Sequence, residues 1–143
     1  MNVLQELMDK IYKEQQLERE RNNYNLGNLI EDLSKYPKDA KVYIEPFCLY
    51  PTDFGSYRGY YSDLSIEFTT ESNGLNCGEL LDKAKNCVGK SFYGYKGGDF
   101  EMTKNSVIWI SNYGKVSNII LTGVKDRFGD GSYLELTWKI EEE

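Results

Sequence analysis

The segment Tyr133–Ile140 alternates between apolar and polar side chains, and this pattern constrains the fold more than any other feature of the sequence. Apolar side chains at every second position from Leu134 to Ile140 would lie on one face of a strand, and the polar side chains between them on the other. One packed face and one wet face are typical of an antiparallel sheet. The chain must therefore supply further strands that pair with this one.

Other strands are predicted from shorter apolar or alternating runs, which cover Val42–Ile44, Leu64–Phe68, Ser106–Ser111 and Ile119–Val124. Between the first two we predict a long loop from Pro46 to Tyr61, where Gly and Tyr are frequent. Asn112-Tyr113-Gly114 predicts a turn after the third run. These strands lie mostly in the C-terminal half of the chain.

Three helices are predicted from apolar residues at helical spacing. The first is amphipathic from Val3 to Ile11, becomes strongly polar from Lys13 to Asn23, and would serve either to cap the core or as an oligomerisation arm. A short second helix would run from Leu26 to about Lys35, before Tyr36-Pro37. The third has capping-box spacing at its start, Asn76 with Glu79, and a suitable C-cap residue in Gly89.

The order of these elements favours a single α+β domain with a largely antiparallel β-sheet and about three helices, because strands follow one another instead of alternating with helices. A length of 143 residues suits one hydrophobic core. We divide the chain into an N-terminal helical arm, residues 1–23, and an α+β ligand-binding domain, residues 24–143.

Composition excludes several classes of function. The chain contains no histidine, which removes Ser-His and Cys-His nucleophile pairs and the usual zinc ligand sets. A net charge of −6 argues against general affinity for duplex nucleic acid, although a small anionic ligand needs only a few cations. No run approaches the length of a membrane span and no signal sequence is evident, so we expect a cytosolic protein. Cys48, Cys77 and Cys87 form no CxxC pair and are expected to be reduced core residues.

Two motif-like segments do not fit the motifs they resemble. Gly89-Lys90-Ser91 resembles the end of a phosphate-binding loop, but it follows a predicted helix instead of a strand, and Ala84 replaces the required glycine. The segment Asp126–Gly131 resembles a calcium-binding loop, but Phe128 occupies a ligand position. A tight hairpin turn explains this segment better.

Aromatic and glycine residues are concentrated in two segments, 54–61 and 92–100. Aromatic faces stack on nucleobases, glycines permit close approach of a ligand to the backbone, and Arg58 and Lys96 are placed to meet phosphates. These are the components of a nucleotide pocket. The alternative is that the tyrosines pack over the edge of the sheet while the glycines turn the chain.

Arginine is scarce in the predicted domain, where Arg58 and Arg127 both lie in loops beside aromatic residues. Guanidinium groups in such positions suit bidentate contacts to anions, although either could equally form a surface salt bridge.

Four strings of sequence resemble a family of small phage proteins, the Thoeris anti-defence sponge family of the first type. The strings are SYRGYY, DLSIEF, GELLDKAKNCVGKSFYGYKGGDFEM and VIWISNYG.

The resemblance implies a protein, not an enzyme, that captures a cyclic ADP-ribose isomer made by bacterial TIR enzymes and leaves it intact. It also implies immune evasion in the cytoplasm of an infected bacterial host, possible capture of a cyclic di- or trinucleotide at separate sites, and homo-oligomers from dimer to hexamer. Asn112 and Arg127 would contact the nucleotide, with Arg58 a weaker correspondence. Ser111 departs from the small apolar residue expected there. No cofactor or metal is implied.

Combined with the aromatic segments, the candidate ligand-binding residues are Arg58, Tyr60, Tyr95, Lys96, Phe100, Asn112, Tyr113 and Arg127. Two other functions remain open from the sequence. The first is an acidic inhibitor that binds a host defence protein directly, although the carboxylates form only one run, Glu141–Glu143. The second is a metal-dependent phosphodiesterase that uses Asp99, Glu101 or Glu67.

Overall fold

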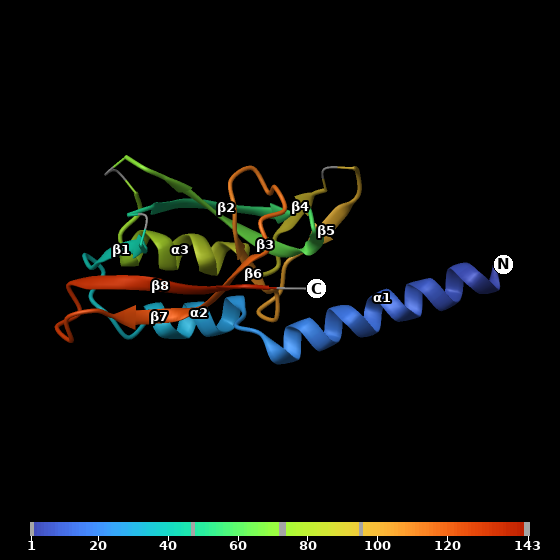
Figure 1. The fold of residues 1–143 in the computed structure, drawn as a ribbon, viewed down its shortest axis with the longest axis horizontal. Coiled ribbons are helices and arrows are strands. Elements are labelled where there is room, and N and C mark those ends of the chain that lie inside the picture. The colour runs from blue at the N-terminus through green and yellow to red at the C-terminus, as the bar shows by residue number, and fades with distance from the viewer. Residues whose placement is uncertain (1, 47, 72–73, 95, 142–143) are drawn as a thin grey trace.

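The chain is represented by a computed structural model that describes residues 2–46, 48–71, 74–94 and 96–141 (Figure 1). The helices in these ranges are α1 (Val3–Asn22), α2 (Leu26–Leu33) and α3 (Cys77–Cys87). The strands are β1 (Lys41–Ile44), β2 (Tyr50–Tyr57), β3 (Tyr60–Thr69), β4 (Ser91–Tyr93), β5 (Asp99–Glu101), β6 (Ile108–Ile110), β7 (Ile119–Asp126) and β8 (Tyr133–Ile140).

Six strands form one sheet in the order β1-β8-β7-β6-β3-β2, and β4 pairs with β5 in a separate hairpin. The β1–β8 and β3–β6 pairs are parallel, whereas the β2–β3, β6–β7 and β7–β8 pairs are antiparallel. The predicted α+β class, with a largely antiparallel sheet and three helices among the described residues, is confirmed.

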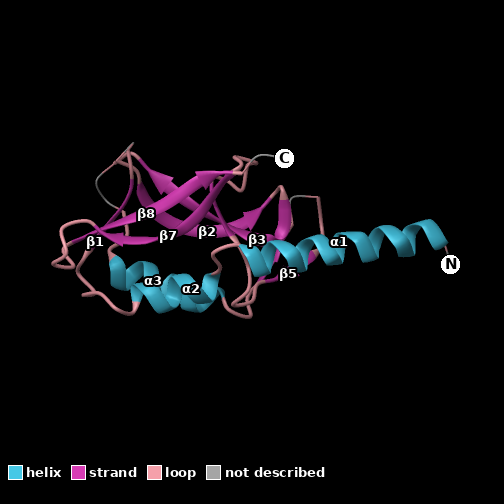
Figure 2. Ribbon diagram, turned by 60° about the horizontal axis from the view of Figure 1, so that its bottom comes forward, coloured by secondary structure: helices cyan, strands magenta, loops and turns pink. Residues whose placement is uncertain are grey.

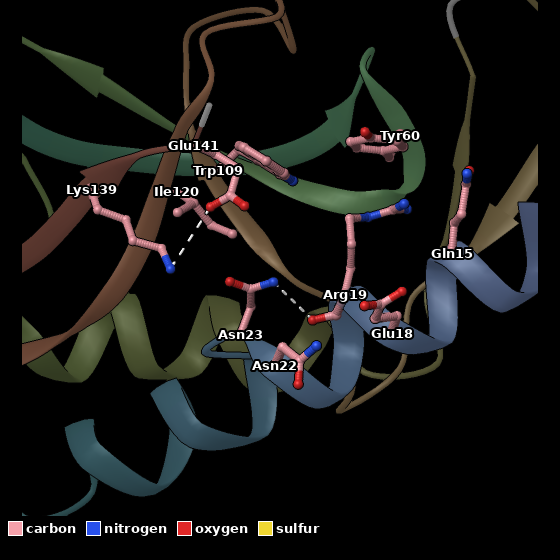
Figure 3. A pocket seen from close by; sticks show the side chains of 10 residues that line it. All are labelled: Gln15, Glu18, Arg19, Asn22, Asn23, Tyr60, Trp109, Ile120, Lys139 and Glu141. Carbon is pink, nitrogen blue, oxygen red and sulfur yellow. Dashed lines mark hydrogen bonds and ion pairs between the residues drawn. The ribbon is translucent and has the colours of Figure 1, made fainter. Parts of the chain in front are cut away.

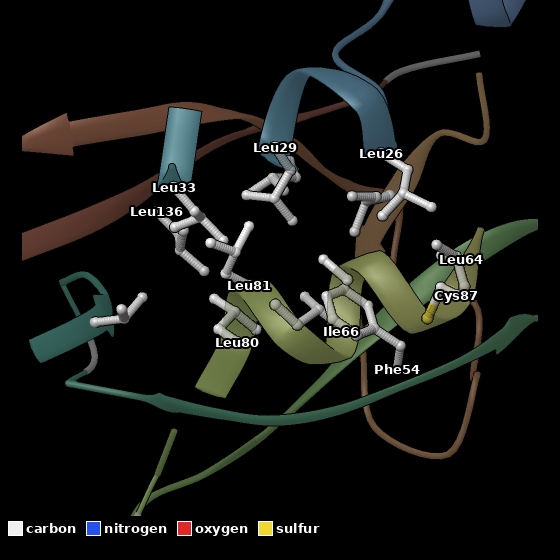
Figure 4. Close-up of a cluster of buried hydrophobic side chains, with 14 of the residues drawn as sticks. Leu26, Leu29, Leu33, Phe54, Leu64, Ile66, Leu80, Leu81, Cys87 and Leu136 are labelled. Carbon is white, nitrogen blue, oxygen red and sulfur yellow. The ribbon is translucent and has the colours of Figure 1, made fainter. Parts of the chain in front are cut away.

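Helices α2 and α3 cover one face of the sheet, and the main core lies between them and the strands (Figures 2 and 4). Leu26, Leu29 and Leu33 of α2 meet Leu80 and Ala84 of α3. The strands contribute alternate residues to this core, among them Leu64, Ile66, Ile108, Ile110, Leu134 and Leu136. Burial of these aliphatic side chains stabilises the fold by roughly 1.5 to 3 kcal/mol each.

Both short helices begin with reciprocal side-chain caps. Asn76 Oδ1 accepts a hydrogen bond from the Glu79 amide at 2.9 Å, and Glu79 Oε1 accepts one from the Asn76 amide at 3.0 Å. This capping box was predicted from the sequence, and Asn25 with Asn28 forms a second. The caps satisfy amide groups that a helix start leaves without partners, which fixes where each helix begins.

The loop predicted from Pro46 to Tyr61 is wrong, because strand β2 occupies half of it and β3 begins at Tyr60. Pro51 and Gly55 are unusual in a strand, and the pairing with β3 shifts register after Pro51 and again after Ser56. Apolar residues of β2 therefore do not alternate regularly, which hides the strand from a search for period two. Because β2 lies at the edge of the sheet, its proline is tolerated.

The β4–β5 hairpin was likewise not predicted, since its segment looked like a glycine-rich loop.

Cys77 and Cys87 are buried as predicted, and burial raises the pKa of the Cys87 thiol to about 11. Cys48 is exposed, so its assignment to the core is wrong. Cys48 lies in the turn between Ile44 and Leu49, whose backbones form an antiparallel bridge. Its φ is 52°, a left-handed conformation.

Helix α1 projects from the rest of the molecule, and its N-terminal half has no contact with the sheet in either view (Figures 1 and 2). Its apolar residues Val3, Leu4, Leu7, Met8 and Ile11 are all exposed. None of the helices in the described ranges is both long and apolar enough to cross a membrane. Exposed apolar surfaces of this kind are typical of protein–protein contacts.

We expect the chain to form a dimer or larger closed oligomer through this stripe. Leu7→Asp should lower the mass measured by light scattering at micromolar concentration, because it places a charge at the centre of the stripe. Leu17→Asp is the matched control: at about 1.5 Å and 100° per residue, Leu17 lies about 15 Å farther along the helix than Leu7 and roughly 80° around it. A monomeric wild-type protein, or equal effects of both variants, would contradict the expectation.

Candidate ligand-binding groove

The face of the sheet opposite α2 and α3 carries a second, smaller apolar cluster. It consists of Tyr57, Val107, Trp109 and Ile120. Trp109 lies between Ile108 and Ile110 on β6, so its side chain points away from the main core. The rings of Tyr57 and Trp109 stack with their centroids 4.7 Å apart and an interplanar angle of 6°. This cluster supports both the loop that follows β6 and the end of α1.

The loop of residues 112–118 reaches the turn of the β2–β3 hairpin and is fixed at several points. Asn112 Oδ1 accepts a hydrogen bond from the Phe68 amide at 2.8 Å. The Gly114 carbonyl accepts one from the Arg58 amide at 2.7 Å. The Tyr57 hydroxyl oxygen accepts two, from the amides of Ser117 and Asn118, at 3.0 and 3.1 Å. The loop is therefore held in place by the sheet below it.

Tyr113 stands out within this loop. Its φ is 58°, a left-handed conformation that costs energy for a bulky residue, and 75% of its side chain is exposed. Gly114 follows with φ 69°, and a Cβ there would lie 2.3 Å from the Ser56 carbonyl oxygen, so only glycine fits. An aromatic ring kept on a strained backbone and turned to solvent has no packing role that explains it. Such outliers concentrate at binding sites.

A groove of about 350 Å³ runs beside Tyr113, and we refer to it as the tyrosine groove. Its lining residues are Gly55, Ser56, Arg58, Glu67, Tyr93, Tyr113 and Gly114. Tyr93 reaches it from the β4–β5 hairpin and is 76% exposed. The groove thus combines two aromatic rings, one guanidinium, one carboxylate and two glycines. These groups can stack on a planar base, bind a phosphate and accept hydrogen bonds from hydroxyl or amino groups.

The structure brings together only some of the residues expected from the sequence. Arg58 and Tyr113 line the tyrosine groove. The side chain of Asn112 is bonded to the β3 backbone, so this residue shapes the loop. Phe100 packs on Tyr61 with ring centroids 5.1 Å apart. Lys96 is exposed at the tip of the β4–β5 hairpin, and Tyr95 lies outside the described residues.

Arg127 lies at the opposite end of the sheet, in the connection between β7 and β8 (Figure 1). At about 3.3 Å per residue, the 8 residues of β7 place it roughly 25 Å from the 112–118 loop. Its guanidinium carbon is 6.0 Å from the Phe128 ring centroid and 5.6 Å from that of Tyr133. The turn beside it is tight as predicted, because the Asp126 carboxylate accepts hydrogen bonds from the Gly129 and Gly131 amides. Within one chain, Arg127 cannot join Arg58 around a small ligand.

Tyr60 lines a different cavity, between the end of α1 and the sheet, which we call the arm cavity (Figure 3). This cavity measures about 460 Å³. It is lined by Gln15, Glu18, Arg19, Asn22, Asn23, Tyr60, Trp109, Ile120, Lys139 and Glu141. Lys139 Nζ lies 3.8 Å from Glu141 Oε2, and the Arg19 guanidinium carbon lies 3.5 Å from the Tyr60 ring centroid. Its two cations are thus already engaged within the chain.

Asp63 lies beneath the arm cavity and connects α1 to the sheet. Its fully buried carboxylate accepts hydrogen bonds from Trp109 Nε1 at 2.9 Å and Gln16 Nε2 at 3.0 Å. Arg19 Nε lies 3.5 Å from the same group. Burial raises the pKa of Asp63, although the two hydrogen bonds and the Arg19 charge act in the opposite direction. These contacts make the arm cavity a junction that orients α1.

Sequence reasoning did not identify this junction. Asp63 begins an alternating strand at a position on the polar face, where an aspartate is expected to meet water. The polar stretch of α1 that holds Gln16 and Arg19 also looked fully exposed. The available signal was indirect: the predicted polar face of the sheet also carries Trp109, which needs a covering partner for its ring.

Comparison of the chain with protein-family models, curated proteins and solved structures found no match.

Among the carboxylates considered for metal-dependent chemistry, Glu67 lines the tyrosine groove, whereas Asp99 and Glu101 are exposed on β5. In the part of the chain that the structure describes, no three His, Cys, Asp or Glu side chains cluster in a way that could hold a metal ion.

The raised pKa of Asp63 predicts a pH-dependent effect of Asp63→Asn. A carboxyl group with a raised folded-state pKa contributes most to stability below its ordinary pKa of 3.8, and this contribution is lost as the pH rises through the raised value. Asparagine does not titrate. The melting temperature of the variant minus that of the wild type should therefore increase between about pH 4 and pH 8. Parallel melting curves over this range would show that Asp63 is not penalised by burial.

Proposed function

We propose that the protein binds a cyclic nucleotide immune signal, a cyclic ADP-ribose isomer, in the tyrosine groove and sequesters it without cleaving it. In this role it is a phage anti-defence protein that prevents activation of the host Thoeris effector in the bacterial cytoplasm. The observation that carries the proposal is Tyr113, an exposed ring on a strained backbone beside Arg58. The similarity to the sponge family, noted from the sequence, supports the same ligand class.

The chemistry of the groove suits such a ligand. Tyr113 and Tyr93 offer aromatic faces to adenine, and stacking of a base on an aromatic ring is worth roughly 1 to 3 kcal/mol. Arg58 offers a planar pair of donors to a phosphate. Gly55 leaves backbone accessible at the groove wall, and the Glu67 carboxylate can accept hydrogen bonds from ribose hydroxyl groups. A cation and an anion in one groove would also orient the ligand.

A sponge must bind tightly, since it competes for a signal present at low concentration. Nanomolar affinity corresponds to about −12 kcal/mol, which requires a deep site or one shared between chains. The tyrosine rings are exposed in one chain, so a second protomer would have to cover them. Arg127 and Phe128, at the far end of the sheet, could reach the groove only from that second protomer. Homo-oligomerisation is therefore part of the proposal.

The direct test is capture and release. The protein is incubated with cyclic ADP-ribose, separated from free ligand and heat-denatured, and the released compound is analysed by chromatography. We expect intact nucleotide from the wild type and little from Tyr113→Ala, because the main stacking surface is lost. Tyr12→Ala, which removes an exposed tyrosine on α1, should capture as the wild type does. Altered nucleotide would indicate an enzyme, and no capture by the wild type would favour a protein-binding inhibitor.

The two arginines give a second prediction. If each contacts a phosphate, Arg58→Ala and Arg127→Ala should each remove about 2 kcal/mol of binding free energy, roughly a thirty-fold loss of affinity by calorimetry. The melting temperature of each variant is measured alongside, so that a loss of affinity caused by a loss of stability is recognised. Arg→Lys at either position should restore only part of the affinity, since an ammonium lacks the planar fork. Unchanged affinity of Arg127→Ala would restrict the site to the groove of one chain.

A further inference from the structure

We infer that Tyr57 is a positioning residue for the tyrosine groove, whose buried hydroxyl holds the 112–118 loop where Tyr113 faces the ligand. The inference rests on the proposed function, because it assigns a role in binding to a residue that the ligand does not touch. Tyr57 was not among the residues expected to bind.

Burial prevents Tyr57 from contacting a ligand itself. Its side chain is 1% exposed, and its ring is stacked on Trp109. A purely structural residue at this position could be phenylalanine, which would fill the same volume and stack on the same indole. The hydroxyl therefore needs a separate explanation, and its hydrogen bonds supply one.

The hydroxyl oxygen of Tyr57 accepts hydrogen bonds from two successive backbone amides, those of Ser117 and Asn118. Asn118 has φ 59°, and this left-handed turn allows neighbouring N–H groups to converge on one acceptor. Directly after it, Ile119 begins β7. The hydroxyl thus fixes the point at which the loop re-enters the sheet.

The other end of the loop is fixed independently. Asn112 binds the Phe68 amide, and the Gly114 carbonyl binds the Arg58 amide. Tyr113 lies between these contacts with its backbone in a left-handed conformation. Strained conformations persist only where the surroundings determine them fully, and Tyr57 supplies the restraint on one side. Loss of its hydroxyl would free the loop to relax and turn the Tyr113 ring away from Arg58.

The test is a double-mutant cycle measured by calorimetry with cyclic ADP-ribose as the probe. Tyr57→Phe should lower the affinity by about tenfold, as expected when two amides lose their acceptor and a preorganised loop relaxes. In a Tyr113→Ala background the same substitution should change the affinity by less than about twofold. Such coupling identifies a residue that acts through Tyr113, and a general loss of stability would not produce it.

Tyr24→Phe is the matched control. The Tyr24 hydroxyl donates to Asp32 Oδ2 at 2.6 Å, next to α2 on the other face of the sheet. Removing it should lower the melting temperature and leave the affinity unchanged. Amide hydrogen exchange provides a readout that needs no ligand: Ser117 and Asn118 should exchange faster in Tyr57→Phe than in the wild type, and equally fast in Tyr24→Phe and the wild type.

Wild-type affinity in Tyr57→Phe, or additive effects in the cycle, would overturn the inference. If the wild type does not bind cyclic ADP-ribose, the proposed function fails, and the role of Tyr57 in binding fails with it. The exchange rates then decide whether Tyr57 positions the loop at all. Unchanged rates at Ser117 and Asn118 would overturn that part as well.

Discussion

The stacking of Tyr57 on Trp109 connects the features found on the open face of the sheet. Trp109 donates a hydrogen bond to the Asp63 carboxylate, which also accepts one from Gln16 of α1. The Tyr57 hydroxyl accepts two hydrogen bonds from the loop that carries Tyr113. The two rings therefore connect the Asp63 contacts beneath the arm cavity with the tyrosine groove. This face of the sheet, which would otherwise be exposed to solvent, therefore has its own small apolar core. Polar groups at the edge of that core form hydrogen bonds to α1 and to the 112–118 loop.

Much of the fold follows from local pattern. Strand β8 has the bounds expected from its strict alternation, and the capping box at Asn76 sets the start of α3. Strand β2 was missed because Pro51 and two shifts in register disrupt its alternation, and an edge strand can accommodate both. Helix α2 ends at Leu33, before the expected Lys35. Local signals were reliable where one face of an element is uniformly buried.

The candidate site was only partly predictable. Aromatic and cationic residues near Arg58 and Tyr113 are visible in the sequence, but their proximity depends on β6 pairing in parallel with β3. That pairing places the start of the loop beside Phe68 at the end of β3, and the loop then reaches Arg58 at the turn of the β2–β3 hairpin. No local pattern specifies which strands become neighbours. For the same reason Arg127, next to Phe128 in another loop, looked equivalent to Arg58 although it lies at the other end of the sheet.

The two edges of the sheet bear on how copies of this chain can meet. Strand β1 has 4 residues, and β2 carries Pro51 and irregular pairing, so neither edge presents a long, regular row of free amide and carbonyl groups. Edges of this kind resist the addition of a strand from another molecule. Any contact between copies would then be made by side chains, whose shape and charge limit the number of partners. Growth into an open-ended β-stack is thereby hindered.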